Sequence, residues 1–530
     1  MGVGREESDM KEETQEQGWI KRIPLNIAPP SLKDNTADVD RLAKAIKKAL
    51  DIRDVAIDFL FSKKIPSLLR EYKYRVQAVV YEGFVSWHLA GLFPMDGDHS
   101  IYGIAADLGT STIALRLINL VTGEVKDETS FLNPQIEMGQ DILTRIHFAS
   151  QDGGLQRLQT VLIDRLNEEI GRMTERHGME PDSLVGMSAA GNTTMSHLFL
   201  GLDPYWICRE PYIPSINRFD VIFAARLGLS IHPYAPVLVI PNVGSYFGGD
   251  LIAGILASGM TRRAETSFLV DVGTNAEVVI GNQDWLVGCA GAAGPALEGG
   301  VTRMGMMASP GAINRVFFDP DSGRFDLETI GGKPPVGICG SGLIDLVAQL
   351  FLAGMIDFRG EYVESRCGSR LREIDGIRHF IVVPSQDSAT GNDLTLSQKE
   401  IDSVMRSKAA MYTILSTITQ MTNISIKEIS RFYIAGTFGA YMDARSAIDI
   451  GMIPDLPLDA YKPLGNSSLA GATKALLSRV AKEEIYSIRD RVTYVELNVN
   501  QEFMTLFSAA KCIPHTDRSL FPSVKEWNSD

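Results

Sequence analysis

The feature that most constrains the fold is a strand, a short polar turn and a second strand, which occur twice in the chain. The first copy carries Asp107-Leu108-Gly109-Thr110 and continues into an apolar run, Ile113–Leu120. The second carries Asp271-Val272-Gly273-Thr274 and continues into Ala276–Ile280. The two aspartates are 164 residues apart (271 less 107). Two copies at this separation indicate a duplicated domain, each half opening with a β-hairpin, rather than a solenoid of short repeats.

Helical periodicity alternates with these strands. Residues 155–177 and 402–421 both have apolar residues at helical spacing. Strands that alternate with helices indicate the α/β class. The sequence therefore predicts an α/β protein with a duplicated core.

A small α+β domain is predicted before the first repeat. Val39, Leu42, Ile46 and Leu50 have the spacing of an amphipathic helix, and Asn35 or Thr36 is its expected N-cap. A second helix is expected near residues 65–72, and Glu82-Gly83 is expected to turn a β-hairpin. The glutamate-rich start of the chain has little apolar content and is expected to be disordered. The expected organisation is an acidic tail over 1–18, the small α+β domain over 19–100, and two core subdomains over 101–265 and 266–530.

Composition excludes several classes of function. The formal net charge is -14 and the pI is about 5.2, which argues against binding to nucleic-acid phosphates. No apolar run approaches the roughly 18 residues that a membrane span needs. The cysteines are sparse and far apart, without a CxxC pair, which suits a reducing compartment and argues against a metal cluster. We therefore expect a cytoplasmic protein without a nucleic-acid or membrane partner. The cysteines are Cys208, Cys289, Cys339, Cys367 and Cys512.

The repeated Asp-x-Gly-Thr turn has the chemistry of a phosphate site. Glycine lets the backbone approach a phosphate, while successive N–H groups and the threonine hydroxyl donate to its oxygens. The aspartate is suited to hold hydrated Mg²⁺. Turns that need glycine only for their geometry remain the alternative. The predicted phosphate-binding residues are Gly109, Thr110 and Ser111 in the first turn and Gly273, Thr274 and Asn275 in the second, and the predicted Mg²⁺ residues are Asp107 and Asp271.

Paired turns of this kind resemble those of the actin, heat-shock chaperone and sugar kinase superfamily. In that superfamily, two ribonuclease-H-like halves each supply one phosphate hairpin to an ATP cleft. The resemblance also implies a catalytic aspartate at a helix start shortly before the second hairpin. Asp250 lies 21 residues before Asp271 (271 less 250) and would orient or deprotonate the attacking water or hydroxyl. The alternative is that Asp250 only caps the helix that starts at Leu251.

Two glycine-rich turns are further candidates for nucleotide contacts. Residues 432–441 are expected to form a strand, a glycine turn and a helix, in which Gly436 and Gly439 would let adenosine approach the backbone. Gly340 lies in the turn 337–342 before a helix expected to start near Leu343, and amides there favour an anion. Close helix packing is the alternative for this turn. The chain has no GxxxxGK[ST] sequence, which excludes a P-loop ATPase.

A finer resemblance is to the reductive activators of corrinoid proteins. It extends over residues 20 to 515, and the small N-terminal domain looks like the middle domain of that family. The matching stretches, in order, are Asn133-Pro134-Gln135, 139–142, Ala190–Met195, Glu210-Pro211-Tyr212, 241–244, 293–300, 494–497 and 513–515.

This resemblance implies a function. Such a protein uses ATP to reduce cobalt(II) to cobalt(I) in a corrinoid protein of a methyl-transfer system. Family members typically begin with a ferredoxin-like domain that holds a [2Fe-2S] cluster, and this chain lacks it. We therefore expect no iron-sulfur cluster here and an external low-potential electron donor such as a ferredoxin-type protein. The chain also lacks the Asp-x-His-x-x-Gly cobalamin motif, and kinship suggests a possible homodimer.

Two other functions remain open from the sequence. A small-molecule kinase of the sugar kinase type would share the cleft and Asp250 but would need an acceptor substrate. A nucleotide-gated binding module would bind ATP without turnover. A contact from Lys408 to adenine or phosphate is one alternative, but a solvated helix face is the favoured interpretation of this residue. The scattered histidines are interpreted as packed or surface residues.

Overall fold

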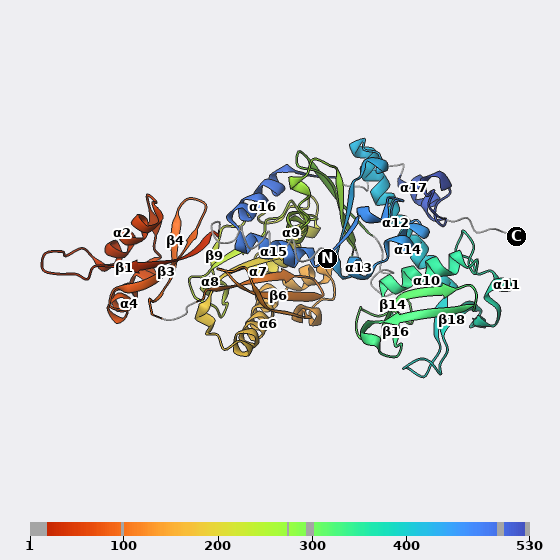
Figure 1. Ribbon diagram of the computed structural model, residues 1–530, viewed down its shortest axis with the longest axis horizontal. Helices are drawn as coiled ribbons and strands as arrows, with labels where there is room; N and C mark the ends of the chain where they lie inside the picture. Colours follow the sequence, from red (N-terminus) through yellow and green to blue (C-terminus); the bar gives the residue numbers. More distant parts are fainter. Residues whose placement is uncertain (1–17, 97–99, 273–274, 293–301, 496–502, 525–530) are drawn as a thin grey trace. The chain divides into compact units, whose positions relative to one another are not determined.

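The computed structural model describes residues 18–96, 100–272, 275–292, 302–495 and 503–524. These residues form two compact units (Figure 1). Unit 1 contains the described residues up to Ala257 together with Ser468–Asp490, and unit 2 contains Ser258–Ser467 together with the described residues from Arg491 onwards. The predicted acidic tail lies almost wholly outside the described residues.

The small N-terminal domain of unit 1 is a four-stranded sheet with helices packed on it (Figure 1). The strand order is β1-β3-β4-β2, and β3 and β4 form the hairpin predicted at Glu82-Gly83. Leu42 and Ile46 of the first helix are fully buried in the core of this domain, as their spacing predicts. The elements are β1 (Ile20–Asn26), α2 (Asp38–Leu50), β2 (Val55–Ala56), α3 (Phe59–Ser62), α4 (Ile65–Glu71), β3 (Arg75–Glu82) and β4 (Trp87–Pro94).

The start of α2 differs from the sequence expectation. Ala37 is the N-cap residue and makes no side-chain cap hydrogen bond. The hydroxyl of Thr36 instead donates to Oδ1 of Asp34 at 2.7 Å. This local hydrogen bond competes with capping, which is a known property of short polar side chains. The expected cap at Asn35 or Thr36 is therefore wrong.

The main sheet of unit 1 has the order β7-β6-β5-β8-β10-β9. Strands β5, β6 and β7 form an antiparallel meander, and β5, β8 and β10 are parallel to one another. The strands are β5 (Tyr102–Leu108), β6 (Thr112–Asn119), β7 (Val125–Leu132), β8 (Leu184–Gly191), β9 (Ile222–Phe223) and β10 (Pro236–Val239). The helices are α5 (Ile142–Ala149), α6 (Gly154–Arg176), α7 (Thr193–Leu200), α8 (Ala224–Leu227) and α9 (Gly249–Ser258). No helix in the described ranges combines the length and the apolarity that a membrane crossing requires.

Unit 2 repeats this plan, which confirms the predicted duplication and the α/β class. The strand order is β21-β20-β11-β12-β13-β22. Strands β11, β12 and β13 form the antiparallel meander, and β20 and β21 extend the sheet in parallel with β11. The elements are β11 (Ser267–Val272), β12 (Asn275–Gly281), β13 (Leu286–Ala292), α12 (Gln398–Thr422), β20 (Arg431–Ala435), α13 (Gly436–Tyr441), α14 (Ala444–Asp449), β21 (Tyr461–Gly465), β22 (Val492–Tyr494) and α17 (Phe503–Ala510).

An additional layer is inserted in unit 2 between β13 and α12. It contains the three-stranded sheets β15-β14-β16 and β17-β18-β19, and α10 lies along β14 (Figure 1). The elements are β14 (Ala312–Asp319), β15 (Arg324–Thr329), β16 (Gly337–Ile338), α10 (Gly340–Leu352), α11 (Glu364–Cys367), β17 (Leu371–Ile374), β18 (Ile377–Val383) and β19 (Leu394–Ser397).

Two helices late in the chain belong to unit 1. They are α15 (Ser467–Leu477) and α16 (Arg479–Arg491). A Cβ on Gly471 of α15 would lie 2.0 Å from the carbonyl oxygen of Ala253 of α9, so the two helix backbones touch. The predicted second core subdomain, 266–530, does not separate out this return of the chain to unit 1.

Lys408 is fully buried on α12, so the predicted solvated helix face is wrong. Its Nζ donates to the carbonyl oxygens of Cys512 and Pro514, the latter at 2.8 Å. Burial lowers the pKa of Lys408 to about 7, because the charged form loses its hydration.

Stability should therefore depend on pH through Lys408. As the pH rises from 7 to 9 the folded chain loses a proton from Lys408 that the unfolded chain keeps, so folding is increasingly favoured as the pH rises. The free energy of unfolding of the wild type should rise relative to that of Lys408→Met by up to about 1.4 kcal/mol per pH unit. Urea unfolding followed by circular dichroism at several pH values measures this difference. Parallel curves for the two proteins from pH 7 to 9 would show that folded Lys408 keeps its proton.

Candidate functional site

The candidate site of unit 1 lies at the carboxyl ends of three parallel strands. The turn 109–111 follows β5, Asn192 follows β8, and the segment after β10 leads to Asp250 on α9. In open α/β sheets, ligands bind at this end of the strands. The topology therefore brings together sequence-predicted residues that are far apart along the chain.

The carbonyl groups of the turn 109–111 are all held by protein donors. Nδ2 of Asn133 donates to the oxygen of Gly109 at 2.9 Å, and the N–H of Asn133 donates to the oxygen of Ser111 at 2.9 Å. Nη2 of Arg145 donates to the oxygen of Thr110 at 2.6 Å. Because the oxygens are turned toward these donors, the N–H groups of the turn are left for the oxygens of an anion.

Gly109 is required by the shape of this turn. A Cβ at this position would lie 2.3 Å from the carbonyl oxygen of Thr112. The turn therefore needs glycine for its geometry, as the alternative interpretation states. Its oriented carbonyls also match the geometry expected of an anion site.

Asn192 connects the turn to helix α7. Its Oδ1 accepts from the N–H of Met195 at 2.9 Å and caps the helix, while its Nδ2 donates to the hydroxyl of Thr110 at 3.0 Å. The Thr110 oxygen thus accepts a hydrogen bond from protein, and its own proton can be donated to a ligand.

Asp107 is half-buried near the end of β5. Its Oδ1 accepts a hydrogen bond of 2.7 Å from the hydroxyl of Ser468, at the start of α15. Ser468 is buried, with 6% of its surface exposed. A half-buried carboxylate is the kind of oxygen ligand that hydrated Mg²⁺ prefers.

Asp250 lies in the first turn of α9, one residue inside the helix that begins at Gly249. It is therefore not the N-cap residue of the alternative interpretation. Its Oδ1 accepts from the N–H of Leu251 at 2.8 Å. A Cβ on Gly248 would lie 2.6 Å from this oxygen and 2.5 Å from Cα of Asn192. Only glycine at position 248 lets the Asp250 carboxylate lie this close to the Asn192 turn.

Unit 2 brings Asp271 next to Gly436. A Cβ on Gly436, whose φ is +80°, would lie 3.0 Å from Oδ1 of Asp271, across the parallel strands β11 and β20. Gly273 and Thr274 lie outside the described residues, and the side chain of Asn275 is not described. The second turn and the assignment of its phosphate contacts remain predictions.

The other two predicted glycines lie in helices α13 and α10. Gly439 packs on Ile434, because a Cβ there would lie 2.5 Å from Cγ2 of Ile434. Gly340 is the first residue of α10, which starts three residues earlier than expected. Its neighbour Gly342 would place a Cβ 2.2 Å from the oxygen of Ile313, which favours close helix packing as a reason for this turn.

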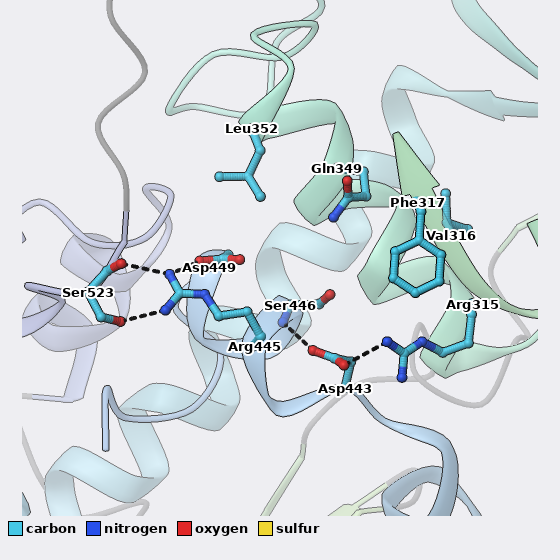
Figure 2. A pocket seen from close by; sticks show the side chains of 10 residues that line it. All are labelled: Arg315, Val316, Phe317, Gln349, Leu352, Asp443, Arg445, Ser446, Asp449 and Ser523. Carbon is cyan, nitrogen blue, oxygen red and sulfur yellow. Dashed lines mark hydrogen bonds and ion pairs between the residues drawn. The ribbon is translucent and has the colours of Figure 1, made fainter. Parts of the chain in front are cut away.

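A cavity of about 470 Å³ lies in unit 2 between β14, α10 and α14. Figure 2 shows that Arg315 points toward Asp443 and that Arg445 points toward Ser523. Arg315 contacts Asp443 at 2.8 Å and the buried Asp345 at 3.1 Å, and Arg445 pairs with Asp449. Burial raises the pKa of Asp345 to about 6. The cavity is lined by Arg315, Val316, Phe317, Gln349, Leu352, Asp443, Arg445, Ser446, Asp449 and Ser523.

Four residues that contact the predicted site residues were not predicted from the sequence: Asn133, Arg145, Asn192 and Ser468. Asn133 and Asn192 lie in stretches that carried the resemblance, so their sequence context was a usable signal. Arg145 and Ser468 had no local signal, because their partners are reached only through the fold.

The described residues give no sign of a protein-ligated metal centre. Across these ranges, no three His, Cys, Asp or Glu side chains gather in a way that could hold a metal ion. The five cysteines are free thiols. A nucleotide-bound Mg²⁺ needs few protein ligands and relies on phosphate and water oxygens, so Asp107 fits such an ion.

The chain matches three family models along almost its whole length. They are described as the RACo linker region at residues 12–98, the RACo middle region at 102–263, and the C-terminal domain of RACo, the ASKHA domain, at 265–525. The small N-terminal domain thus matches the linker region, so its predicted likeness to the middle domain is wrong.

Relatives and a solved structure agree with these matches. The "corrinoid activation enzyme RamQ" of Eubacterium limosum is 29% identical over 92% of this chain and 82% of that protein. A "[Co(II) methylated amine-specific corrinoid protein] reductase" of Methanosarcina barkeri is 24% identical over 74% of this chain and 73% of that protein. The solved structure of a "reductive activator for corrinoid,iron-sulfur protein" is 35% identical, with a TM-score of 0.87, over 98% of this chain and 84% of that chain. The chain therefore belongs to the family of reductive activators of corrinoid proteins.

Proposed function

We propose that this protein uses ATP to activate a corrinoid protein reductively, taking its cobalt from the +2 to the +1 state in a methyl-transfer system. The electron comes from a separate low-potential donor such as a ferredoxin-type protein. Membership of the activator family supports the reaction class. The observation that carries the ATP-dependent part is the turn 109–111, whose carbonyls are held inward beside Asp107.

The proposed cofactors are ATP and Mg²⁺. Bound Mg²⁺ neutralises charge on the phosphates and polarises them for attack. Gly109, Thr110 and Ser111 donate to phosphate oxygens, and Asp107 holds the ion largely through water. Asp271 has the same role in unit 2, with the turn that follows it. Asp250 orients or deprotonates the attacking water.

The nucleoside of ATP is proposed to bind in unit 2 near Gly436. Asp443 lines the cavity of Figure 2 and lies two residues after the end of α13, the helix that starts at Gly436. Both of its arginines are paired with carboxylates, so it offers little net positive charge to phosphates. A neutral base and ribose match a lining that mixes apolar and hydrogen-bonding side chains.

ATP is needed because the cobalt(II)/cobalt(I) couple of a corrinoid lies below ordinary cellular donors. Reduction becomes favourable only if the cobalt environment changes. The nucleotide-bound protein would bind a corrinoid-protein state with altered cobalt ligation more tightly than the resting state. The binding free energy then shifts the corrinoid protein toward the reducible state.

Cobalt(I) formation tests this proposal directly. The purified protein would be mixed with a cobalt(II) corrinoid iron-sulfur protein or a methylated-amine-specific corrinoid protein, and with titanium(III) citrate as the reductant. The cobalt(I) absorption band should grow with Mg-ATP and stay at background without nucleotide. Equal cobalt(I) formation with and without ATP, on both corrinoid proteins, would contradict the proposal.

The same assay separates the two alternatives. A nucleotide-gated module would give equal activation with ATP and with a non-hydrolysable analogue. A small-molecule kinase would release ADP in proportion to an added sugar or acid, without any corrinoid protein. An activator should release ADP faster when the corrinoid protein is present, and none of the sugars or acids should replace it.

A further inference from the structure

Arg145 on α5 is a fully buried arginine whose contacts are all uncharged. Its Nε donates to the oxygen of Gly139 at 2.8 Å, and its Nη1 lies 3.3 Å from Oε1 of Gln135 and 3.2 Å from the sulfur of Met195. Its Nη2 donates to the oxygen of Thr110 in the phosphate turn. In the described part of the chain, no carboxylate lies within ion-pair distance of this guanidinium.

The nearest acidic influence comes from Asp141, which is engaged elsewhere. Its Oδ1 caps α5 by accepting from the N–H of Thr144 at 2.8 Å, and its Oδ2 accepts from the Thr144 hydroxyl at 2.8 Å. Burial lowers the pKa of Arg145 to about 10, so the group still carries its proton at neutral pH. Unit 1 therefore has a buried positive charge without an ion-pair partner directly beneath the turn 109–111.

A buried lone cation is costly, by several kcal/mol even after the protein relaxes. Such a cost is tolerated where the charge has another use. The carbonyl of Thr110 and the N–H of Ser111 belong to one peptide group. A guanidinium bound to the oxygen polarises that peptide and strengthens its N–H as a donor on the other side.

The stretch 133–142 is explained by the same cluster. Asn133 holds the Gly109 carbonyl, and Gln135 and Gly139 accept from the guanidinium. A Cβ on Gly139 would lie 2.8 Å from the backbone nitrogen of Arg145 and 2.9 Å from its Cγ. The stretch 133–142 is part of the family resemblance, but the resemblance assigns no role to it. In the structure, Gln135 and Gly139 of this stretch contact the side chain of Arg145.

We infer that Arg145 is a positioning residue of the nucleotide site, which orients the phosphate turn through Thr110 and supplies a buried counter-charge to the phosphates of ATP. The inference rests on the proposed function, because it takes ATP as the ligand of this turn. It does not depend on the corrinoid reaction.

The test compares nucleotides of different charge on two variants. Arg145→Met removes the charge at similar length, and Arg145→Lys keeps a charge without the planar set of donors. Titration calorimetry would give Kd values for Mg-ATP, Mg-ADP and adenosine. Arg145→Met should weaken ATP binding by about 10- to 100-fold and ADP binding by less, with adenosine changed by under threefold, because a charge-assisted contact acts on the phosphates. Arg145→Lys should recover at least half of the loss on a logarithmic scale.

Arg41→Met is the matched control. Arg41 is also buried, with 7% of its surface exposed, but it pairs with Asp34 in the small N-terminal domain. This variant should lose stability without any change in nucleotide Kd. Circular dichroism would establish that each variant is folded.

Several outcomes would overturn the inference. One is a folded Arg145→Met that binds ATP like the wild type, and another is an equal loss for ATP, ADP and adenosine, which would indicate a structural role alone. If Arg145→Met does not fold, Arg145→Lys decides the question. A more than tenfold weaker ATP binding in that charged variant would contradict the inference that Arg145 acts as a counter-charge. A wild type that binds ATP but forms no cobalt(I) contradicts the proposed function and leaves this inference in place.

Discussion

Replacing Asp250 with asparagine is expected to lower kcat for ATP hydrolysis by about 10²- to 10⁴-fold, with the Kd of ATP changed only a few-fold. The amide cannot accept the proton of the attacking water, but it keeps the size of the side chain. Its Oδ1 can still accept from the N–H of Leu251, as the carboxylate does at 2.8 Å. The loss should therefore appear in turnover, measured as phosphate release at saturating ATP, rather than in binding.

Asp58→Asn provides the comparison. Asp58 caps α3 in the small N-terminal domain by accepting from the N–H groups of Leu60 and Phe61. It is thus an aspartate at a helix start, like Asp250, without any link to the phosphate turn. Its variant should turn over ATP at the wild-type rate. Wild-type turnover in Asp250→Asn would remove Asp250 from the catalytic assignment and leave it as a residue of the first helical turn.

The local parts of the fold could be predicted from the sequence. The turn at Gly109 is predictable from the sequence because glycine between two apolar strands favours a tight turn. The duplicated meander followed from the repeat, and α6 followed from Leu158, Leu162 and Leu166, which are all fully buried. Each of these features depends on interactions between near neighbours in the chain.

The residues that support the site could not be predicted in this way. Ser468 hydrogen-bonds to Asp107, which is 361 residues away in the sequence. No sequence pattern around Ser468 indicates this partner. Arg145 lies on a short helix whose pattern is equally compatible with an exposed arginine. Lys408 has helical spacing too, and only the packing of the C-terminal segment on α12 buries it. Periodicity gives the face of a helix, but it does not give what covers that face.

The return of α15 and α16 to unit 1 has the same origin. The chain crosses from unit 2 at Ser467, in the middle of a region that looks uniform in composition. Gly471 is a local signal for the contact between α15 and α9, because a glycine inside a helix often marks a place where another backbone packs closely. The reason is the backbone of Ala253, which only the folded chain brings next to it.

Replacing Gly471 with valine is expected to destabilise unit 1 by more than about 4 kcal/mol, at the upper end of single-substitution effects. A Cβ at this position would lie 2.0, 2.4 and 2.6 Å from the oxygen, carbon and Cα of Ala253. All three are backbone atoms of α9, so the clash cannot be relieved by the rotation of a side chain. Urea unfolding should show the loss, and Gly471→Ala, which already carries the clashing Cβ, should show most of it.

Gly171→Ala is the matched control, because Gly171 lies within α6 in unit 1 and nothing lies within 4 Å of its Cβ position. This variant should be as stable as the wild type or more stable by about 0.5–1 kcal/mol, since alanine is the better helix former. A Gly471→Ala protein with the same gain would mean that α9 and α15 can separate without cost.

The Gly471 contact also bears on the chemistry of the site. Helix α9 carries Asp250, and α15 carries Ser468, which holds Asp107. One backbone contact therefore links the helix that carries Asp250 to the helix whose Ser468 binds Asp107. If Gly471→Ala folds with the helices pushed apart, ATP turnover should fall more than ATP affinity, because catalysis depends on ångström-scale positions and binding depends on them less. Turnover and affinity that fall together would instead indicate that the phosphate turn itself has been lost.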